Sequence, residues 1–219
     1  MGSTDHFGGP FFVLSGINTI MANIFDTLND GLFDANISPR SDEARVWLED
    51  KIAQIGSRSI NRKAIMRSEP VKATGRPKPG RMYMFYYDPE NKKKLPYYDR
   101  FPLVMLVDIS STGFEGLNLH YLPVDLRQRL FYSLLNRASN NSFDENTYLK
   151  ITYDTLKSMR TYKAFRPCYK RYLTNNIQGM IANVPSNEWE NAIHLPTAMF
   201  RKKSESVVHA ESRRMVEKF

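Results

Sequence analysis

The side chains that could carry out acid–base or metal chemistry are scattered along the sequence. The four histidines, at positions 6, 120, 194 and 209, have no HxxxH or HExxH spacing that would place two of them beside a metal on one helical face. Asp88, Asp99 and Asp108 could hold a divalent ion as nuclease carboxylates do, but two of the three lie beside turns, where Asp is common. GxSxG, Walker and GxGxxG motifs are absent. We therefore predict no catalytic residue, no metal site and no cofactor.

The single cysteine, Cys168, excludes an internal disulfide and a thiolate zinc cluster. We expect it to be a small buried hydrophobic residue. Hydrophobic residues make up 42% of the chain, so wholesale disorder is excluded. No apolar run approaches the roughly 18 residues that span a bilayer, and we expect no membrane partner.

Positive charge is the strongest indication of binding chemistry. The net charge is +8 and the pI about 9.5, which favours an anionic partner such as nucleic acid or an acidic protein surface. Residues 57–81 contain eight cations against one acid, and the prolines and glycines of their second half predict an extended connector. Mobile cations of this kind release counterions when they meet a polyanion, although a solvated linker is the alternative. The candidate phosphate contacts here are Arg76, Lys78 and Arg81.

A second basic segment follows Lys157 and has no acid until after Asn187. Its aromatic residues alternate with cations, and we expect it to be partly helical, either binding phosphates or burying its rings with the cations in solvent. A third set is predicted at a strand–strand connection beside Tyr97 and Tyr98, where bases could stack on rings while lysines meet phosphates. The candidate nucleic-acid contacts in these two segments are Lys92, Lys93, Lys94, Lys163, Arg166, Lys170 and Arg171.

Three consecutive antiparallel strands are predicted between Gly80 and Leu122. Arg81–Tyr87 is rich in aromatic residues and methionine, and Leu103–Ile109 is a continuous apolar run. Gly116–Leu122 alternates, with Leu117, Leu119 and Tyr121 on one face and Asn118 and His120 on the other. Pro123 then opens a helix. This order predicts an α+β fold, with a small antiparallel SH3-like β-barrel or meander core flanked by helices and with extended N- and C-terminal arms.

An apolar stripe predicts a helix over Ile17–Phe33. The stripe packs either on the core of its own chain or on a neighbouring subunit, and it comprises Ile17, Ile20, Met21, Ile24, Phe25 and Leu28. A second helix is expected to run to about Ile55, and Arg201–Phe219 is a charged tail predicted to become helical on a partner surface. We divide the chain into a helical arm region over 1–75, an α+β core domain over 76–200 and a tail over 201–219.

Four strings of the sequence resemble a family of virion proteins from contractile-tailed bacteriophages (myoviruses), which carries the label DNA end protector. The strings are KLPYYDRFPLV (Lys94–Val104), GFEGLNLHYLP (Gly113–Pro123), FRPCYKRYL (Phe165–Leu173) and NEWENAIHLPTAMF (Asn187–Phe200). The resemblance covers roughly 76–200 and leaves the first 75 residues outside. It implies binding to the ends of packaged DNA, protection from host exonuclease, and action at head completion before tail joining. It brings no catalytic residues.

Two functional classes follow. The first is a non-enzymatic virion protein, made in the host cytoplasm, that binds double-stranded DNA ends or phosphates at the head–tail region without reading sequence. The second is a neck or baseplate subunit that acts through protein contacts. In either class the partners include phage neck, portal or baseplate subunits in a symmetric assembly. DNA binding requires the basic clusters on one face, whereas assembly does not. A toxin-like ribonuclease, similar to small-barrel enzymes with a basic first strand, is a weaker alternative.

Overall fold

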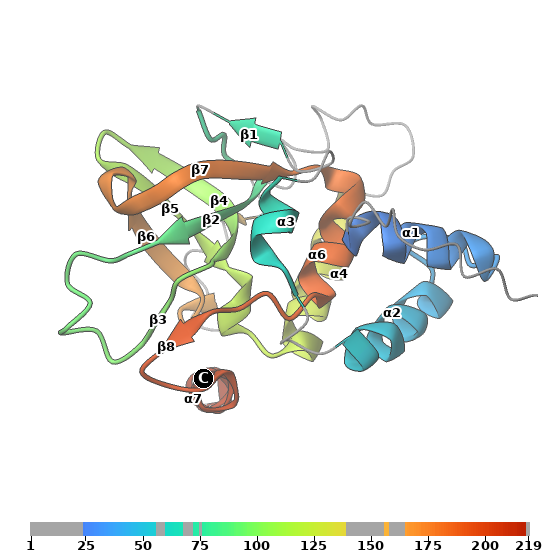
Figure 1. The fold of residues 1–219 in the computed structure, drawn as a ribbon. Helices are drawn as coiled ribbons and strands as arrows, with labels where there is room; N and C mark the ends of the chain where they lie inside the picture. The colour runs from blue at the N-terminus through green and yellow to red at the C-terminus, as the bar shows by residue number, and fades with distance from the viewer. Residues whose placement is uncertain are drawn as a thin grey trace, which may run out of the picture.

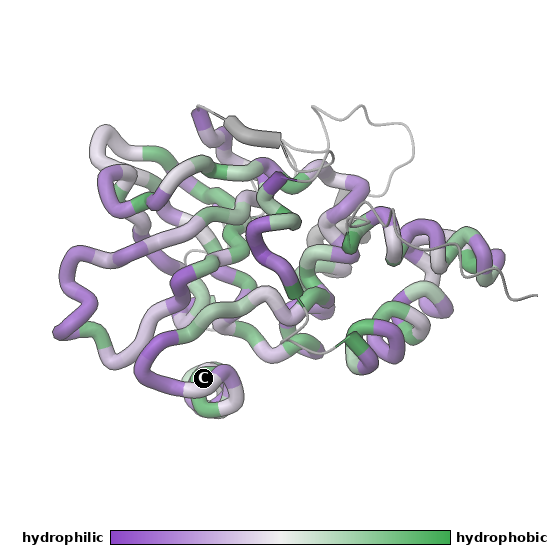
Figure 2. The backbone as a smooth tube through the Cα atoms, in the orientation of Figure 1, coloured by the Kyte–Doolittle hydropathy of each residue, from purple (hydrophilic) through white to green (hydrophobic). Residues whose placement is uncertain are grey.

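The computed structural model describes residues 24–55, 60–67, 72–74, 76–138, 156–157 and 165–217. The main β-sheet forms one end of the molecule and most of the helices form the other, while the C-terminal helix (Glu205–Glu217) lies below the sheet end in Figure 1. Hydrophobic residues follow the inner strands and helix faces, whereas the connection between β2 (Met82–Tyr87) and β3 (Tyr98–Asp99) is hydrophilic (Figure 2). None of the helices in these ranges is long and apolar enough to cross a membrane.

The main sheet is antiparallel and has six strands in the order β1-β7-β2-β4-β5-β6. A separate two-stranded sheet pairs β3 with β8. The strands are β1 (Lys72–Thr74), β2 (Met82–Tyr87), β3 (Tyr98–Asp99), β4 (Leu103–Ser110), β5 (Gly113–Asn118), β6 (Tyr169–Leu173), β7 (Ile177–Val184) and β8 (Phe200–Arg201).

The predicted meander is present, because β2 pairs with β4 and β4 pairs with β5. The third strand starts earlier than expected and ends at Asn118, where a short 3-10 helix, η1 (Leu119–Tyr121), begins. The side-chain oxygen of Asn118 accepts a hydrogen bond of 3.0 Å from the backbone N–H of His120 and so caps this turn. The turn ends the strand alternation after Asn118. Asn118 and His120, which the alternation groups together, are both fully buried and both contact the Asp99 carboxylate.

The sheet does not close into a barrel, so the SH3-like barrel prediction is wrong. In its strand order β1 and β6 are the two edges. The sheet is nevertheless strongly curved. Phe85 of β2 and Tyr172 of β6 are separated by two intervening strands, yet their ring centroids lie 5.1 Å apart in an edge-to-face contact. The curvature encloses a small core that also contains Tyr83, Val104 and Phe114.

A larger core lies between the sheet and the helices. The helices are α1 (Ile24–Asp34), α2 (Asp42–Ile55), α3 (Arg62–Met66), α4 (Val124–Ala138), α6 (Trp189–His194) and α7 (Glu205–Glu217). Helices α1, α2 and α4 each contact α6, whose Trp189 is buried and donates its indole N–H to the carbonyl oxygen of Val184. This core joins residues from Phe25 to Val208. How the chain divides into domains stays a prediction.

The apolar stripe of the first helix is only partly within the described residues. Phe25 and Leu28 are buried in the core of their own chain, and Ile24 is half-buried against it. The structure therefore shows the first of the two alternatives for Phe25 and Leu28. Ile17, Ile20 and Met21 lie outside the described residues, and a subunit interface at this stripe stays a prediction.

The segments expected to be extended contain regular structure. Helix α3 and strand β1 lie within the predicted basic connector, and β1 pairs with β7. The C-terminal tail is helical as predicted, but the surface on which it packs belongs to this chain. Val208 of α7 is fully buried, and Arg213 forms a bidentate ion pair with Asp125 of α4.

Candidate nucleic-acid interface

The three predicted lysines Lys92, Lys93 and Lys94 lie exposed on the connection between β2 and β3. Backbone hydrogen bonds shape this connection into turns, with the Lys92 N–H donating to the carbonyl of Pro89 at 3.2 Å. The Lys202 ammonium, arriving from the end of β8, donates to the carbonyl oxygens of Lys93 (2.9 Å) and Leu95 (2.6 Å). The predicted strand–strand connection is therefore held against the two-stranded sheet by hydrogen bonds from Lys202.

Lys170 and Arg171 lie on β6, at the free edge of the main sheet. The prediction that this segment is partly helical is wrong for residues 169–173. Lys170 is half-buried, and its ammonium lies 4.1 Å from the centroid of the Tyr121 ring, a cation–π contact. Burial lowers the pKa of Lys170. Arg171 is exposed and donates to the hydroxyl of Thr112 at 3.1 Å.

A pocket of about 510 Å³ lies between the β2–β3 connection and β6. Its lining includes Asn91 from the connection together with Lys170 and Arg171, so the fold brings the third predicted set beside the second. Five tyrosines also line it: Tyr87, Tyr97, Tyr98, Tyr121 and Tyr172. The aromatic and basic residue types that serve single-stranded nucleic acid therefore meet at one opening.

Four of these tyrosines pack on one another in pairs. The rings of Tyr87 and Tyr172 are 5.0 Å apart in an edge-to-face contact, and those of Tyr97 and Tyr121 are 5.8 Å apart. Burial, reinforced by Glu211, raises the pKa of Tyr97 to about 12, and burial also raises the pKa of Tyr121 and Tyr172. At neutral pH these three hydroxyl groups are therefore neutral, and the pocket wall that they help to form is aromatic.

Sequence reasoning missed three further cations near the pocket. Arg201 is paired in register with Tyr98 of the pocket wall, and Lys202 contacts the β2–β3 connection as described. The Lys203 ammonium lies 4.9 Å from the ring centroid of Tyr97 and also pairs with Glu211. These three residues open the charged tail predicted over Arg201–Phe219, and the sequence alone gives no sign that they lie near the pocket.

The remaining predicted cations do not join this group. Arg76, Lys78 and Arg81 lie before β2, at the opposite end of that strand from Tyr87. Five residue steps along β2 correspond to about 17 Å, at roughly 3.3 Å per residue. Arg166 is exposed in the turn before β6, and Lys163 lies outside the described residues. The basic clusters are therefore only partly gathered on one face.

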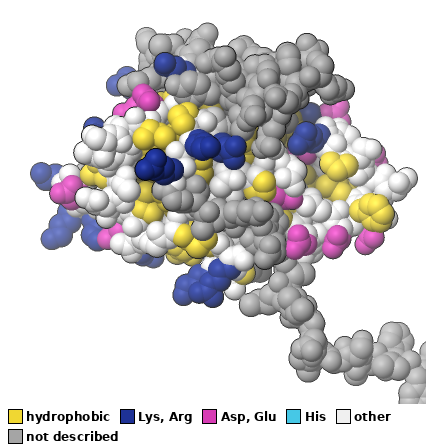
Figure 3. All heavy atoms as spheres, turned by 90° about the horizontal axis from the view of Figure 1, so that it is seen from above, with side chains coloured by type: hydrophobic (Ala, Val, Ile, Leu, Met, Phe, Trp, Pro, Cys, Tyr) yellow, Lys and Arg dark blue, Asp and Glu magenta, His cyan; other side chains and the backbone are white. Residues whose placement is uncertain are grey.

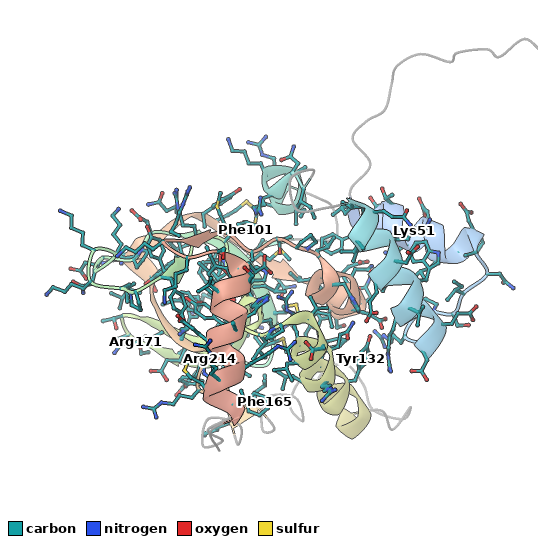
Figure 4. The ribbon with its side chains drawn as sticks, turned by 90° about the horizontal axis from the view of Figure 1, so that it is seen from below. Lys51, Phe101, Tyr132, Phe165, Arg171 and Arg214 are labelled. Atoms are coloured by element: carbon teal, nitrogen blue, oxygen red, sulfur yellow. The ribbon has the colours of Figure 1, made fainter. Side chains whose placement is uncertain are left out.

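We call Lys92, Lys93, Lys94, Lys170, Arg171, Arg201, Lys202 and Lys203 the basic face. It lies far from the helical end of the molecule, as the labels of Arg171 and Lys51 in Figure 4 show. Residues 24–55, which form α1 and α2, carry seven Asp or Glu against three Lys or Arg. Acidic side chains accordingly gather along the edge of these helices in Figure 3, while Lys and Arg side chains predominate toward the sheet. Charge is thus separated along the molecule.

A buried polar network that the sequence did not predict lies beneath the pocket. The Asp99 carboxylate is 2.6 Å from Nδ1 of His120, and Nε2 of His120 is 2.9 Å from the hydroxyl oxygen of Thr197. This carboxylate–imidazole–hydroxyl order resembles a hydrolase triad. However, the Thr197 side chain is fully buried, and Asp99 is the only member of the three that lines the pocket. A hydroxyl without access to substrate cannot act as a nucleophile, so we assign the network a structural role.

Asp99 makes further hydrogen bonds that support this assignment. Its other carboxylate oxygen accepts the backbone N–H groups of Phe101 (2.9 Å) and Met199 (3.0 Å). Burial alone would raise the pKa of Asp99, but His120 and these two donors outweigh it and lower the pKa. One carboxylate thus joins β3, the turn after β5 and the segment before β8. Sequence separations of 21 and 77 residues gave no sign of this arrangement.

Metal and thiol chemistry find no support among the described residues. Within those ranges no group of three His, Cys, Asp or Glu side chains is placed to hold a metal ion. Cys168 is a free, fully buried thiol, as predicted, and burial raises its pKa to about 12. A thiol with so high a pKa is unreactive at neutral pH.

Comparison with known proteins gave one match. A family model described as Phage T4 terminal DNA protecting protein matches residues 42–215. This match covers most of the chain and includes all four strings on which the sequence resemblance rests. A search of curated proteins and a search of solved structures each found no match.

Proposed function

Because the chain belongs to the Phage T4 terminal DNA protecting protein family, we propose that it is a non-enzymatic virion protein that binds the ends of linear DNA through the basic face. Binding shields the ends from exonuclease between packaging and tail joining. The phosphates provide most of the affinity, so sequence preference is weak and salt dependence is strong.

One observation carries this proposal. Lys170 and Arg171 line the tyrosine-lined pocket together with Asn91 and Leu95, the residues that directly flank Lys92–Lys94, although the two segments are more than 70 residues apart in the sequence. Within the basic face, the ion pairs of Lys92 with Asp88 and of Lys203 with Glu211 offset part of the charge. The other cations of the face keep a positive excess beside rings that can stack on bases.

A second function, assembly with other virion subunits at the head–tail region, is favoured by the opposite end of the molecule. Phe33 is 84% exposed near the end of α1 and Val46 is 69% exposed on α2, among the acidic residues of these helices. Exposed apolar side chains in a charged surround are typical of protein contacts. We propose that α1 and α2 face neighbouring neck or portal subunits while the basic face holds DNA.

The proposal is tested by the binding of purified protein to blunt-ended linear DNA and to closed circular DNA across a salt series, with exonuclease protection as the readout. We expect steep weakening with salt and protection of linear ends. The variant K92Q/K93Q/K94Q/K170Q/R171Q should lose protection, and each lost phosphate contact should lower the logarithmic salt slope by about 0.9.

A matched control changes cations at the helical end. The variant R40Q/K51Q/R129Q removes three positive charges away from the basic face and should protect DNA as the wild type does. Absence of binding to either DNA at low salt would overturn the proposal. The face variant removes five charges and the control three, so an equal loss of binding free energy per charge removed would show that net charge alone, rather than this face, holds the DNA.

A further inference from the structure

We propose that the pocket takes the terminal nucleotide of one DNA strand after it separates from its partner strand. Its base lies against the tyrosine rings and its phosphate lies near Lys170 and Arg171. This inference rests on the proposed function and deepens it, because it explains how an end is told apart from the interior of a duplex.

The dimensions of the pocket suit one nucleotide. Its volume of about 510 Å³ falls within the roughly 300–1,000 Å³ of small-ligand sites. An interior base is paired and stacked on both sides, and bringing it into such a pocket requires flipping it out of the duplex. A terminal base is stacked on one side only and is released when the last base pair opens. The pocket is therefore selective for strand ends by geometry alone.

The lining supplies a stacking surface and a cationic edge. Tyr98 is half-buried on β3 and lines the pocket together with Lys170 and Arg171 of β6. A base has a π-face whatever its identity, so stacking on tyrosine holds it without sequence preference. The exposed Arg171 guanidinium is a fork of donors suited to phosphate oxygens. These two features match the two halves of a nucleotide.

An unsatisfied donor in the lining also indicates a ligand. The side-chain Nδ2 of Asn176 is shielded from solvent and has no hydrogen-bond partner within the described structure. A shielded donor without an acceptor is costly, and the edge of a base offers acceptor nitrogen and oxygen atoms. Of the two carboxylates in the lining, Asp99 is bonded to His120, and Glu90 is exposed on the β2–β3 connection.

The inference is tested with a short duplex that is closed by a hairpin at one end and carries 2-aminopurine as its terminal, unpaired nucleotide at the other. A reference duplex, closed by hairpins at both ends, carries 2-aminopurine in an internal bulge. We expect the full-length protein to change the fluorescence of the terminal probe and to leave the internal probe unchanged. Y98L should weaken binding to the open end by about 5- to 150-fold, the range of one lost base–aromatic stack.

Further variants separate a lost ring from a damaged fold. Y98F keeps the ring and should bind the open end more tightly than Y98L. N176A leaves every ring in place and should also weaken end binding, with an unchanged melting temperature. The inference would be overturned if the fluorescence of the terminal probe did not change and wild type, Y98L and N176A bound the open end with equal affinity. The proposed binding of DNA ends would still stand in that case. Failure of the wild type to bind any linear end would instead overturn the proposed function itself.

Discussion

The Asp99 carboxylate lies 2.6 Å from Nδ1 of His120, and both side chains are almost completely shielded from solvent. Each is next in sequence to a tyrosine of the pocket wall, Tyr98 in the first case and Tyr121 in the second. The buried pair therefore fixes the distance between two walls of the pocket. The pair thus supports the pocket wall, and Asp99 itself is part of the lining.

Removing one member of this pair should destabilise the fold strongly. D99N leaves His120 without its carboxylate and gives the two backbone donors a poorer acceptor, so we expect a loss of about 3–5 kcal/mol in the free energy of unfolding. Urea denaturation at pH 7 measures it. The control is D108N, since Asp108 is exposed and bonds only to the backbone N–H of its neighbour, and it should change stability by less than about 0.5 kcal/mol. A D99N protein as stable as D108N would contradict this account.

Asp99 should also contribute to acid sensitivity. Its pKa in the folded protein is below the ordinary value of 3.8, so the unfolded chain binds the proton more readily. The stabilisation is complete above the ordinary pKa and is lost as the pH falls through the lower, folded-state pKa. Unfolding free energies measured below pH 4 should therefore fall more steeply for wild type than for D99N. Parallel pH profiles for the two proteins would exclude Asp99 as a source of this sensitivity.

His194 should act in a higher pH range. Burial lowers its pKa from 6.5 to about 4, so the unfolded chain takes up a proton first when the pH falls. The sign follows: stability is full above about pH 6.5 and declines toward pH 4. We expect wild type to lose about 2 kcal/mol more than H194Q between pH 7 and about pH 5. His209, whose pKa is also lowered, is present in both proteins and cancels in the comparison. An identical decline in H194Q would show that His194 does not titrate in this way.

Gly113 should be essential for docking of the strand that carries Lys170 and Arg171. A Cβ at Gly113 would lie 1.9 Å from the carbonyl oxygen of Tyr172, a clash with backbone that only displacement of β6 relieves. G113A should lower the unfolding free energy by about 1–3 kcal/mol or more and should weaken binding to DNA ends.

The comparison variant for this prediction is G179A. Gly179 has a φ of 81° and open space around it, so alanine there costs only the roughly 1–2 kcal/mol of left-handed backbone strain. G179A should bind DNA ends as the wild type does, as measured by the same protection assay. Retained end binding in G113A would show that β6 does not position the basic face.

Local patterns predicted much of the fold. The apolar runs at Met82–Tyr87 and Leu103–Ser110 are strands, as predicted, and most residues of both are buried. Pro123 precedes a helix, also as predicted. The secondary structure of the segment around Tyr169 and Tyr172 is harder to predict, because four aromatic rings in eleven residues suit a helix or a strand equally well. Pairing with β5 decides between the two, and pairing is not a local property.

The site was predictable only in part. The lysines of the β2–β3 connection and those of β6 were identified from charge, but their proximity depends on how far the sheet curves. Alternation groups His120 with Asn118, but it does not reveal that both are buried against Asp99, which lies 21 and 19 residues away in the sequence. The pocket itself is formed mainly by two segments that are more than 70 residues apart, so it exists only once tertiary contacts form.

The separation of charge along the molecule has a consequence for kinetics. Among the described residues, acidic helices at one end and the basic face at the other separate negative from positive charge along the molecule. In the field of a polyanion such a molecule rotates before it touches, so that the tyrosine-lined opening leads and α1 and α2 trail. The rate of productive encounters with DNA should then exceed the rate expected for randomly oriented collisions. The helical end would remain turned outward, free to meet the next component that arrives.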